Sequence, residues 1–259
     1  MIKRYIVYSG LYISFCAGMI TLFYSNFLSE GLDLLRAALN FAATFIIYNT
    51  AVYNNVFLEE PRAFIKSHLH KFIVSISIVC FFIIIYCIRY LGFLDLINYF
   101  HLFILSLLYI GPKDKNLRKI KYLKPFIISY IWAMSIVAPY YYDNIITPSL
   151  VFILEFFSFI LYLAIIFDFR DRNSDAIEGI KTFAQKLPLK RLKIILMMLV
   201  IFSSLFSLIY FCFSYFLVLN IIANLLVIIA LNDTRNSLYY LVLVDGLIGL
   251  RAFLLFYTT

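Results

Sequence analysis

Long apolar segments, separated by short clusters of charge, dominate this chain and restrict the folds open to it. Of its 259 residues, 64% are hydrophobic and only 14% are charged. A soluble domain of this size cannot bury so much apolar surface, whereas roughly 20 apolar residues suffice to cross a bilayer as a helix. We therefore predict an all-α polytopic membrane bundle that forms a single domain over residues 1–259. About nine transmembrane helices are expected, at 5–25, 33–53, 72–91, 93–111, 125–142, 148–167, 192–211, 213–231 and 238–257.

The positive charges divide unevenly between the two sides of such a bundle. With the N-terminus in the cytoplasm, 19 of the 22 lysines and arginines fall in cytoplasmic segments, which fits the positive-inside rule. The net charge of +8 therefore has a membrane explanation, and we predict no nucleic-acid partner. The composition is poor in glycine and rich in isoleucine, phenylalanine, tyrosine and asparagine. It indicates an AT-rich bacterial genome, so we expect a multi-pass protein of the bacterial inner membrane.

Three aspartates follow the sixth predicted span in an otherwise apolar part of the chain. Asp168, Asp171 and Asp175 are spaced by three and seven residues, which places them on one face of a helix. Like charges on one face repel each other unless a cation neutralises them. Mg²⁺ prefers such oxygen ligands together with substrate phosphates. We predict a magnesium site at these residues, and the alternative is a solvated, charged loop at the membrane edge.

A basic loop, Gly111–Lys124, carries six cations and one acid between the fourth and fifth spans. One interpretation is a topology signal that also attracts anionic lipid headgroups. The other is a clamp for a diphosphate, since charge-assisted hydrogen bonds hold phosphate oxygens well. Near the end of the second span, the amide of Asn49 is expected to line the same polar mouth. The candidate diphosphate-binding residues are Arg172, Lys113, Lys115, Arg118 and Asn49.

The segment from Asp171 to Thr182 resembles the second aspartate motif of the UbiA-type intramembrane prenyltransferases. It matches the pattern in Asp171, in Asp175 four residues later and in Gly179 a further four residues on, followed by Lys181 and Thr182. Nine helices with functional loops after the second, fourth, sixth and eighth also resemble that family. The resemblance implies Mg²⁺-dependent transfer of a prenyl group from a prenyl diphosphate to an aromatic or lipid-like acceptor. The implied partners are that donor, a hydrophobic acceptor and membrane lipids.

The first aspartate motif of the family is degenerate in this chain. Asn49 matches its asparagine, but Thr50, Tyr53 and Phe57 stand where the three acids would be. Glu59 and Glu60 lie two and three residues beyond the last position, so they substitute only in part. The sequence therefore leaves open a catalytically inactive protein of the same fold that binds lipids or a partner.

Ionisable residues inside the predicted spans provide a third interpretation. Glu155, Asp245 and Arg251 lie within apolar segments, and such residues usually face the bundle interior and pair with one another. Asp245 and Arg251 are six residues apart and lie on different faces of the same span, so we expect each of them to pair with a residue of another helix. Deep acids of this kind would suit a small proton-coupled transporter, although the sequence contains no matching pair of interrupted spans in two halves.

Overall fold

The computed structural model describes residues 9–29, 31–59, 68–111, 116–142, 149–211, 215–236 and 239–256. Within these ranges the chain is helical and contains no β-strand. Within the described residues each predicted span overlaps one helix or two consecutive helices, although their ends differ by several residues. The all-α fold class is confirmed. The elements are α2 (Leu11–Ser29), α3 (Leu34–Glu59), α5 (His68–Ile88), α6 (Phe93–Ile110), η1 (Leu117–Lys119), α7 (Lys124–Ile136), α8 (Ala138–Tyr142), α9 (Ser149–Ile177), α10 (Phe183–Lys186), α11 (Leu189–Phe211), α12 (Tyr215–Ala230), η2 (Tyr239–Val244) and α13 (Asp245–Phe256).

Five helices of the described chain, α2, α5, α6, α9 and α11, are long and apolar enough to cross a membrane. Two predicted spans are divided in the structure. The span at 125–142 breaks at Val137 into α7 and α8, and Pro139 then lies in the first turn of α8, where a missing backbone N–H is tolerated. The span at 238–257 begins with the π-helical turn η2 and continues as α13.

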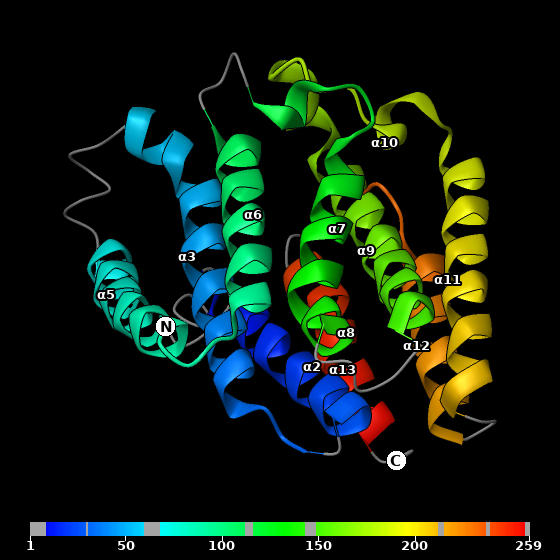
Figure 1. Cartoon of the computed structure of the whole chain (residues 1–259). Coiled ribbons are helices and arrows are strands. Elements are labelled where there is room, and N and C mark those ends of the chain that lie inside the picture. The colour runs from blue at the N-terminus through cyan, green and yellow to red at the C-terminus, as the bar shows by residue number, and fades with distance from the viewer. Residues whose placement is uncertain are drawn as a thin grey trace.

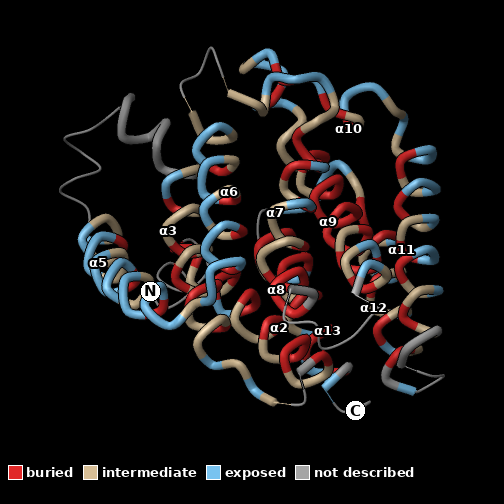
Figure 2. Tube along the Cα trace, in the orientation of Figure 1, coloured by how far each residue is buried: buried red, intermediate tan, exposed pale blue. Residues whose placement is uncertain are grey.

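Helix α9 lies at the centre of the bundle and α5 at its edge (Figures 1 and 2). Of the apolar stretch of α9, 67% is buried inside the protein, compared with 17% for α5. Helix α9 packs against α7 and α11, and its large side chains fill the core, with Phe152, Phe156, Phe159 and Tyr162 almost completely buried. The face of α5 that is not covered by α3 carries exposed apolar side chains, as expected for a helix that meets lipid.

Helix α9 continues beyond the predicted span and carries all three aspartates in its last turns. It ends at Ile177, and Gly179 follows with a φ of +75°, a left-handed conformation that glycine adopts without steric cost. The backbone N–H of Ile180 then donates to the carbonyl of Asp175 at 2.8 Å. This termination brings α10 and the turn before α7 to the same end of the bundle (Figure 1).

Candidate functional site

Two of the three aspartates converge on one buried lysine. The Nζ atom of Lys124 lies 2.7 Å from Oδ2 of Asp175 and 3.0 Å from Oδ1 of Asp168. The exposed fractions are 5% for Lys124, 0% for Asp168 and 1% for Asp175. Burial opposes the charged form of Lys124, but the neighbouring carboxylates outweigh it and raise the pKa of this amine above its ordinary value. The pair is therefore a cation site, and the cation in it is an ammonium of the same chain.

Arg118 extends this cluster toward the surface. One of its terminal nitrogens lies 3.6 Å from Oδ1 of Asp175 and 3.9 Å from a carboxylate oxygen of Glu178. The guanidinium also lies over the ring of Tyr109, 5.9 Å from its centroid, a cation–π geometry. The basic loop after α6 thus supplies at least two cations to the end of α9. We name the group Lys124, Asp168, Asp175, Arg118 and Glu178 the lysine cluster.

A strained turn places Lys124 in this cluster. Tyr122 has a φ of +62°, which is uncommon for a residue with a side chain. Its N–H donates to the carbonyl of Lys181 at 2.9 Å, and its ring stacks on Phe183 with centroids 4.7 Å apart. These contacts attach the turn to the segment that follows α9. Lys124 therefore enters the carboxylate pair from a fixed backbone rather than from a free surface loop.

Asp171 does not join the other two aspartates. It pairs with its neighbour Arg170, whose Nε lies 2.6 Å from Oδ1 of Asp171. This side chain is 30% exposed, whereas Asp168 and Asp175 are buried. Arg170 also lies over the ring of Phe167, 4.8 Å from its centroid. The three aspartates predicted to share one face thus divide into a buried pair and a separate, partly exposed ion pair.

The predicted phosphate-binding residues are dispersed. Arg172 pairs with Asp233 at 2.8 Å, in the turn after α12, and lies over the ring of Phe169, 4.9 Å from its centroid. Asn49 is buried and donates to the backbone carbonyls of Ser9 and Phe45, both at 2.8 Å. It therefore ties α3 to the residues just before α2. Lys113 and Lys115 lie outside the described residues, so of the predicted set Arg118 is the member placed beside the buried aspartates.

A divalent metal does not fit the carboxylates as they are arranged. In the described part of the chain, no group of three or more His, Cys, Asp or Glu side chains is placed to hold a metal ion. Asp168 and Asp175 supply the one converging pair near the predicted site, and Lys124 lies between them. A metal bound to both carboxylates would have to displace that ammonium. The magnesium set of Asp168, Asp171 and Asp175 stays a prediction.

Sequence reasoning did not single out Lys124. It appears in the sequence as the last of six cations in the basic loop, 51 residues from Asp175. One signal could have identified it. Among the cations of that loop, Lys124 alone directly adjoins an apolar span, so it is the one most readily buried with the helix that follows.

A second buried ion pair lies deeper in the bundle and joins four helices. Arg251 of α13 contacts Glu155 of α9, which also accepts hydrogen bonds from Tyr24 at 2.7 Å, Ser203 at 3.0 Å and Ser207 at 2.9 Å. The predicted pairing of Arg251 across helices is confirmed, while Asp245 is buried at the start of α13. We name Glu155, Arg251, Tyr24, Ser203 and Ser207 the glutamate cluster.

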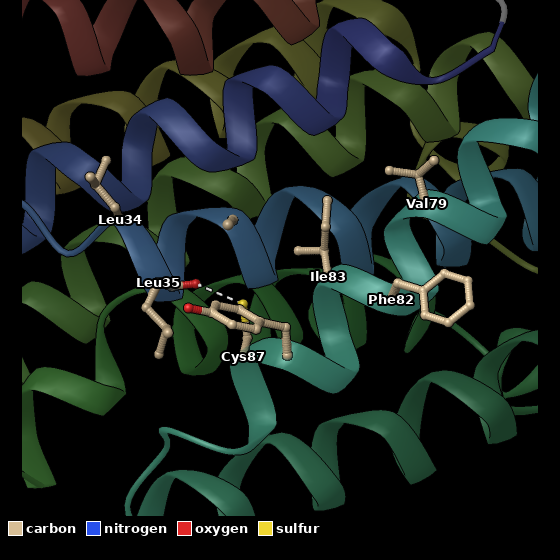
Figure 3. Close-up of a pocket in the computed structure, with 8 residues that line it drawn as sticks. Leu34, Leu35, Val79, Phe82, Ile83 and Cys87 are labelled. Atoms are coloured by element: carbon tan, nitrogen blue, oxygen red, sulfur yellow. Dashed lines mark hydrogen bonds between the residues drawn. The ribbon is translucent and has the colours of Figure 1, made fainter.

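An apolar groove lies between α3 and α5, away from both clusters (Figure 3). Its volume is about 690 Å³. The thiol of Cys87 donates to the carbonyl of Leu35 at 3.6 Å on its wall. Such a surface can take up hydrocarbon but offers no charge to a phosphate. It is lined by Leu34, Leu35, Ala38, Val79, Phe82, Ile83, Tyr86 and Cys87.

The fold and the lysine cluster define a class: a multi-pass helical membrane protein with buried, ion-paired carboxylates at one end of its bundle. Comparison with solved structures makes this more specific. The chain is similar to digeranylgeranylglyceryl phosphate synthase, with a TM-score of 0.60 and 17% identity, over 99% of this chain and 97% of that one. It is also similar to a UbiA homolog from Aeropyrum pernix K1, with a TM-score of 0.57 and 13% identity, over 95% of this chain and 94% of that one.

These similarities show that the chain has the fold of the UbiA-type prenyltransferases, as the resemblance of its second aspartate motif implies. No protein-family model and no curated protein sequence matches the chain significantly. The similarity is therefore one of architecture, and it extends over almost the whole chain.

Proposed function

We propose that this protein binds a prenyl diphosphate at the cytoplasmic end of α9 and transfers the prenyl group to a hydrophobic acceptor. The observation that carries the proposal is the position of Asp168 and Asp175 at one end of a bundle with this fold, beside Arg118 and Lys124. In the proposed reaction the bond between the prenyl carbon and the diphosphate oxygen breaks, and the electron pair leaves with the diphosphate. The acceptor forms the new bond and releases a proton.

The cations of this end have a defined role in that reaction. Arg118, Arg172, Lys113 and Lys115 would hold the phosphate oxygens and neutralise the charge that develops on the leaving group. Asn49 would contribute indirectly to this site, because its side chain holds the backbone just before α2 in place. Mg²⁺ is the cofactor that the resemblance implies, and its chemistry would be the same neutralisation of charge. Lys124 already lies between the two buried carboxylates, so these carboxylates as arranged leave no room for a metal.

Binding of a non-hydrolysable farnesyl or geranylgeranyl thiodiphosphate to the detergent-purified protein tests the proposal. The measurement is made with Mg²⁺ and again with EDTA. We expect saturable binding that Arg118→Ala weakens by roughly tenfold, the effect of losing one charge-assisted contact. A folded protein that binds neither analogue in either condition would exclude a donor site.

A second candidate function is a catalytically inactive protein that uses the same fold to bind lipids or a partner. Two observations favour it: Thr50, Tyr53 and Phe57 replace the acids of the first motif, and Lys124 already neutralises the buried carboxylates. Incubation of the protein in vesicles with a labelled prenyl diphosphate and a membrane lipid extract separates the two. A labelled, extractable product supports transfer, whereas bound but unreacted donor supports the inactive protein.

We also propose the bacterial inner membrane as the location, with the N-terminus in the cytoplasm. The support is the asymmetric distribution of lysine and arginine along the chain. Fusion of alkaline phosphatase or of green fluorescent protein to the C-terminus tests the orientation. An odd number of spans predicts an active phosphatase and a dark fluorescent fusion, and the reverse pattern would contradict the orientation.

A further inference from the structure

We propose that the ammonium of Lys124 is the permanent cation of the Asp168–Asp175 pair and occupies the place that a divalent metal would otherwise take. The proposal deepens the proposed function, because it states how a diphosphate site at this end would be charged. Only this statement about the diphosphate site rests on the proposed function. The cation site itself is argued from contacts within the chain.

The first step is the geometry of the carboxylates. One nitrogen lies 2.7 Å and 3.0 Å from oxygens of two different aspartates, while the guanidinium of Arg118 lies farther out, 3.6 Å from Oδ1 of Asp175. A metal that bridged the same oxygens would lie in the same small volume as Nζ and would be repelled by it. Asp168 and Asp175 therefore accept either the ammonium or a metal, but not both.

The second step is that Asp168 depends on Lys124 for its counter-charge. It is completely buried, and neither of its carboxylate oxygens accepts a hydrogen bond of good geometry within the described chain. The Nζ atom of Lys124 lies 3.0 Å from its Oδ1 atom and supplies its positive partner. A buried carboxylate without a compensating charge is strongly unfavourable, so this residue depends on the cation beside it.

The third step is the backbone that delivers the lysine. The left-handed conformation of Tyr122, its hydrogen bond to the Lys181 carbonyl and its stacking on Phe183 attach the turn before α7 to the segment after α9. Strained conformations of this kind persist only where the surroundings hold them in place. The backbone at Lys124 is consequently held beside the carboxylate pair, and the ion pairs with Asp168 and Asp175 hold its side chain there.

The fourth step concerns the remaining acids that could complete a metal site. Asp171 is paired with Arg170 and is partly exposed. The positions of the first motif carry Thr50, Tyr53 and Phe57, so they add no carboxylate. Among the described side chains, the two carboxylates and Lys124 thus form one paired set. The diphosphate would be neutralised by Arg118 and the other cations of the basic loop.

Thermal unfolding of the full chain in detergent tests this assignment. Three proteins are compared in EDTA and in Mg²⁺: the wild type, Lys124→Met, and the triple variant K124M/D168N/D175N. Methionine keeps an unbranched stem of similar length without the charge. The triple variant is the matched control, since it removes the lysine and the charge of both carboxylates together.

We expect the Tm of the wild type to be the same in Mg²⁺ and in EDTA. Lys124→Met should lower the Tm by roughly 5–10 °C in EDTA, because it removes the counter-charge of the buried Asp168 and leaves Asp175 with the more distant Arg118. Mg²⁺ should restore most of that loss. The triple variant should not respond to Mg²⁺. A parallel measurement of thiodiphosphate binding should give equal affinities for the wild type in Mg²⁺ and in EDTA.

Three results would overturn the assignment. They are a wild-type Tm raised by Mg²⁺ as much as that of Lys124→Met, a Lys124→Met protein that does not respond to Mg²⁺, and wild-type binding of the thiodiphosphate that requires Mg²⁺. If Lys124→Met fails to fold in either condition while the triple variant folds, the metal cannot replace the lysine, and the proposal is wrong. Absence of thiodiphosphate binding in every condition would remove the proposed function but leave the Tm comparison intact.

Discussion

The two buried ion-pair clusters of this protein both depend on α9, yet they are completed in different ways. In the glutamate cluster, one carboxylate meets one guanidinium and three hydroxyl groups from neighbouring helices. In the lysine cluster, two carboxylates share one ammonium, and neither oxygen of Asp168 accepts a well-formed hydrogen bond within the described residues. The first arrangement is satisfied by neutral hydroxyl groups as well as by charge, while in the second the donors are themselves charged, with Lys124 donating to Asp175 at 2.7 Å.

This difference favours a structural role for the glutamate cluster and agrees with the binding role proposed for the lysine cluster. Arg251 lies over the ring of Phe159, 4.4 Å from its centroid. All five residues of the glutamate cluster are buried in the core. The lysine cluster opens through Arg118, which is 21% exposed, and Glu178, which is 35% exposed. A charged ligand that arrives from the membrane surface can therefore reach the lysine cluster, while the glutamate cluster joins four helices in the core.

The largest expected effect is on the glutamate cluster. Arg251→Ala should lower the free energy of unfolding by about 3–5 kcal/mol, because it leaves Glu155 buried without a partner charge. The double variant E155Q/R251M should recover most of this loss, because the amide oxygen of the glutamine can still accept hydrogen bonds from the hydroxyl groups of Tyr24, Ser203 and Ser207. Reversible unfolding in mixed detergent micelles provides the measurement. Equal stability of Arg251→Ala and the wild type would show that the two side chains are not paired.

The next effect separates the aspartates within the site. Asp175→Ala removes one of the two carboxylates that hold Lys124 and should cost about 2–3 kcal/mol. Asp171→Ala removes a partly exposed pair with Arg170 and should cost about 0–1 kcal/mol. The same unfolding measurement compares them. If both substitutions cost the same, the three aspartates act as one set, which is what the sequence alone predicts.

The smallest effect concerns the turn that delivers Lys124. Tyr122→Ala loses the stacking on Phe183 and keeps the unfavourable φ, whereas Tyr122→Gly loses the stacking but relieves the φ. Tyr122→Gly should therefore be more stable than Tyr122→Ala by about 1 kcal/mol. Unfolding midpoints of the two variants provide the comparison. Identical midpoints would indicate that the turn relaxes and that the position of Lys124 is not imposed by the backbone.

Hydropathy predicted the positions of the spans well, because any helix that crosses a bilayer must be apolar over a fixed length. The division at Val137 and the π-helical start of the last span were not predictable in this way, since both depend on local packing. The grouping of the aspartates was predicted only in part. Helical spacing places Asp168 and Asp175 on one face, but the partner that divides them from Asp171 comes from a distant loop.

The pairing of Lys124 with Asp175 was beyond the reach of sequence patterns for the same reason. The two residues are 51 positions apart, and only the packing of α7 on α9 brings them together. By contrast, the pairing of Arg251 across helices followed from a general requirement, because an isolated charge inside a membrane must find an opposite one.

The length of α9 sets the depth at which each cluster lies in the membrane. Its 29 residues extend about 43 Å at a rise of 1.5 Å per residue, well beyond a hydrocarbon layer of roughly 30 Å. Glu155 lies two turns from the start of the helix, and Asp168 lies about 20 Å further along it. The last turns of α9 consequently reach the level of the lipid headgroups. Under the proposed function, a lipid-like donor would bring its phosphates to Arg118 by diffusing sideways, without its tail leaving the bilayer.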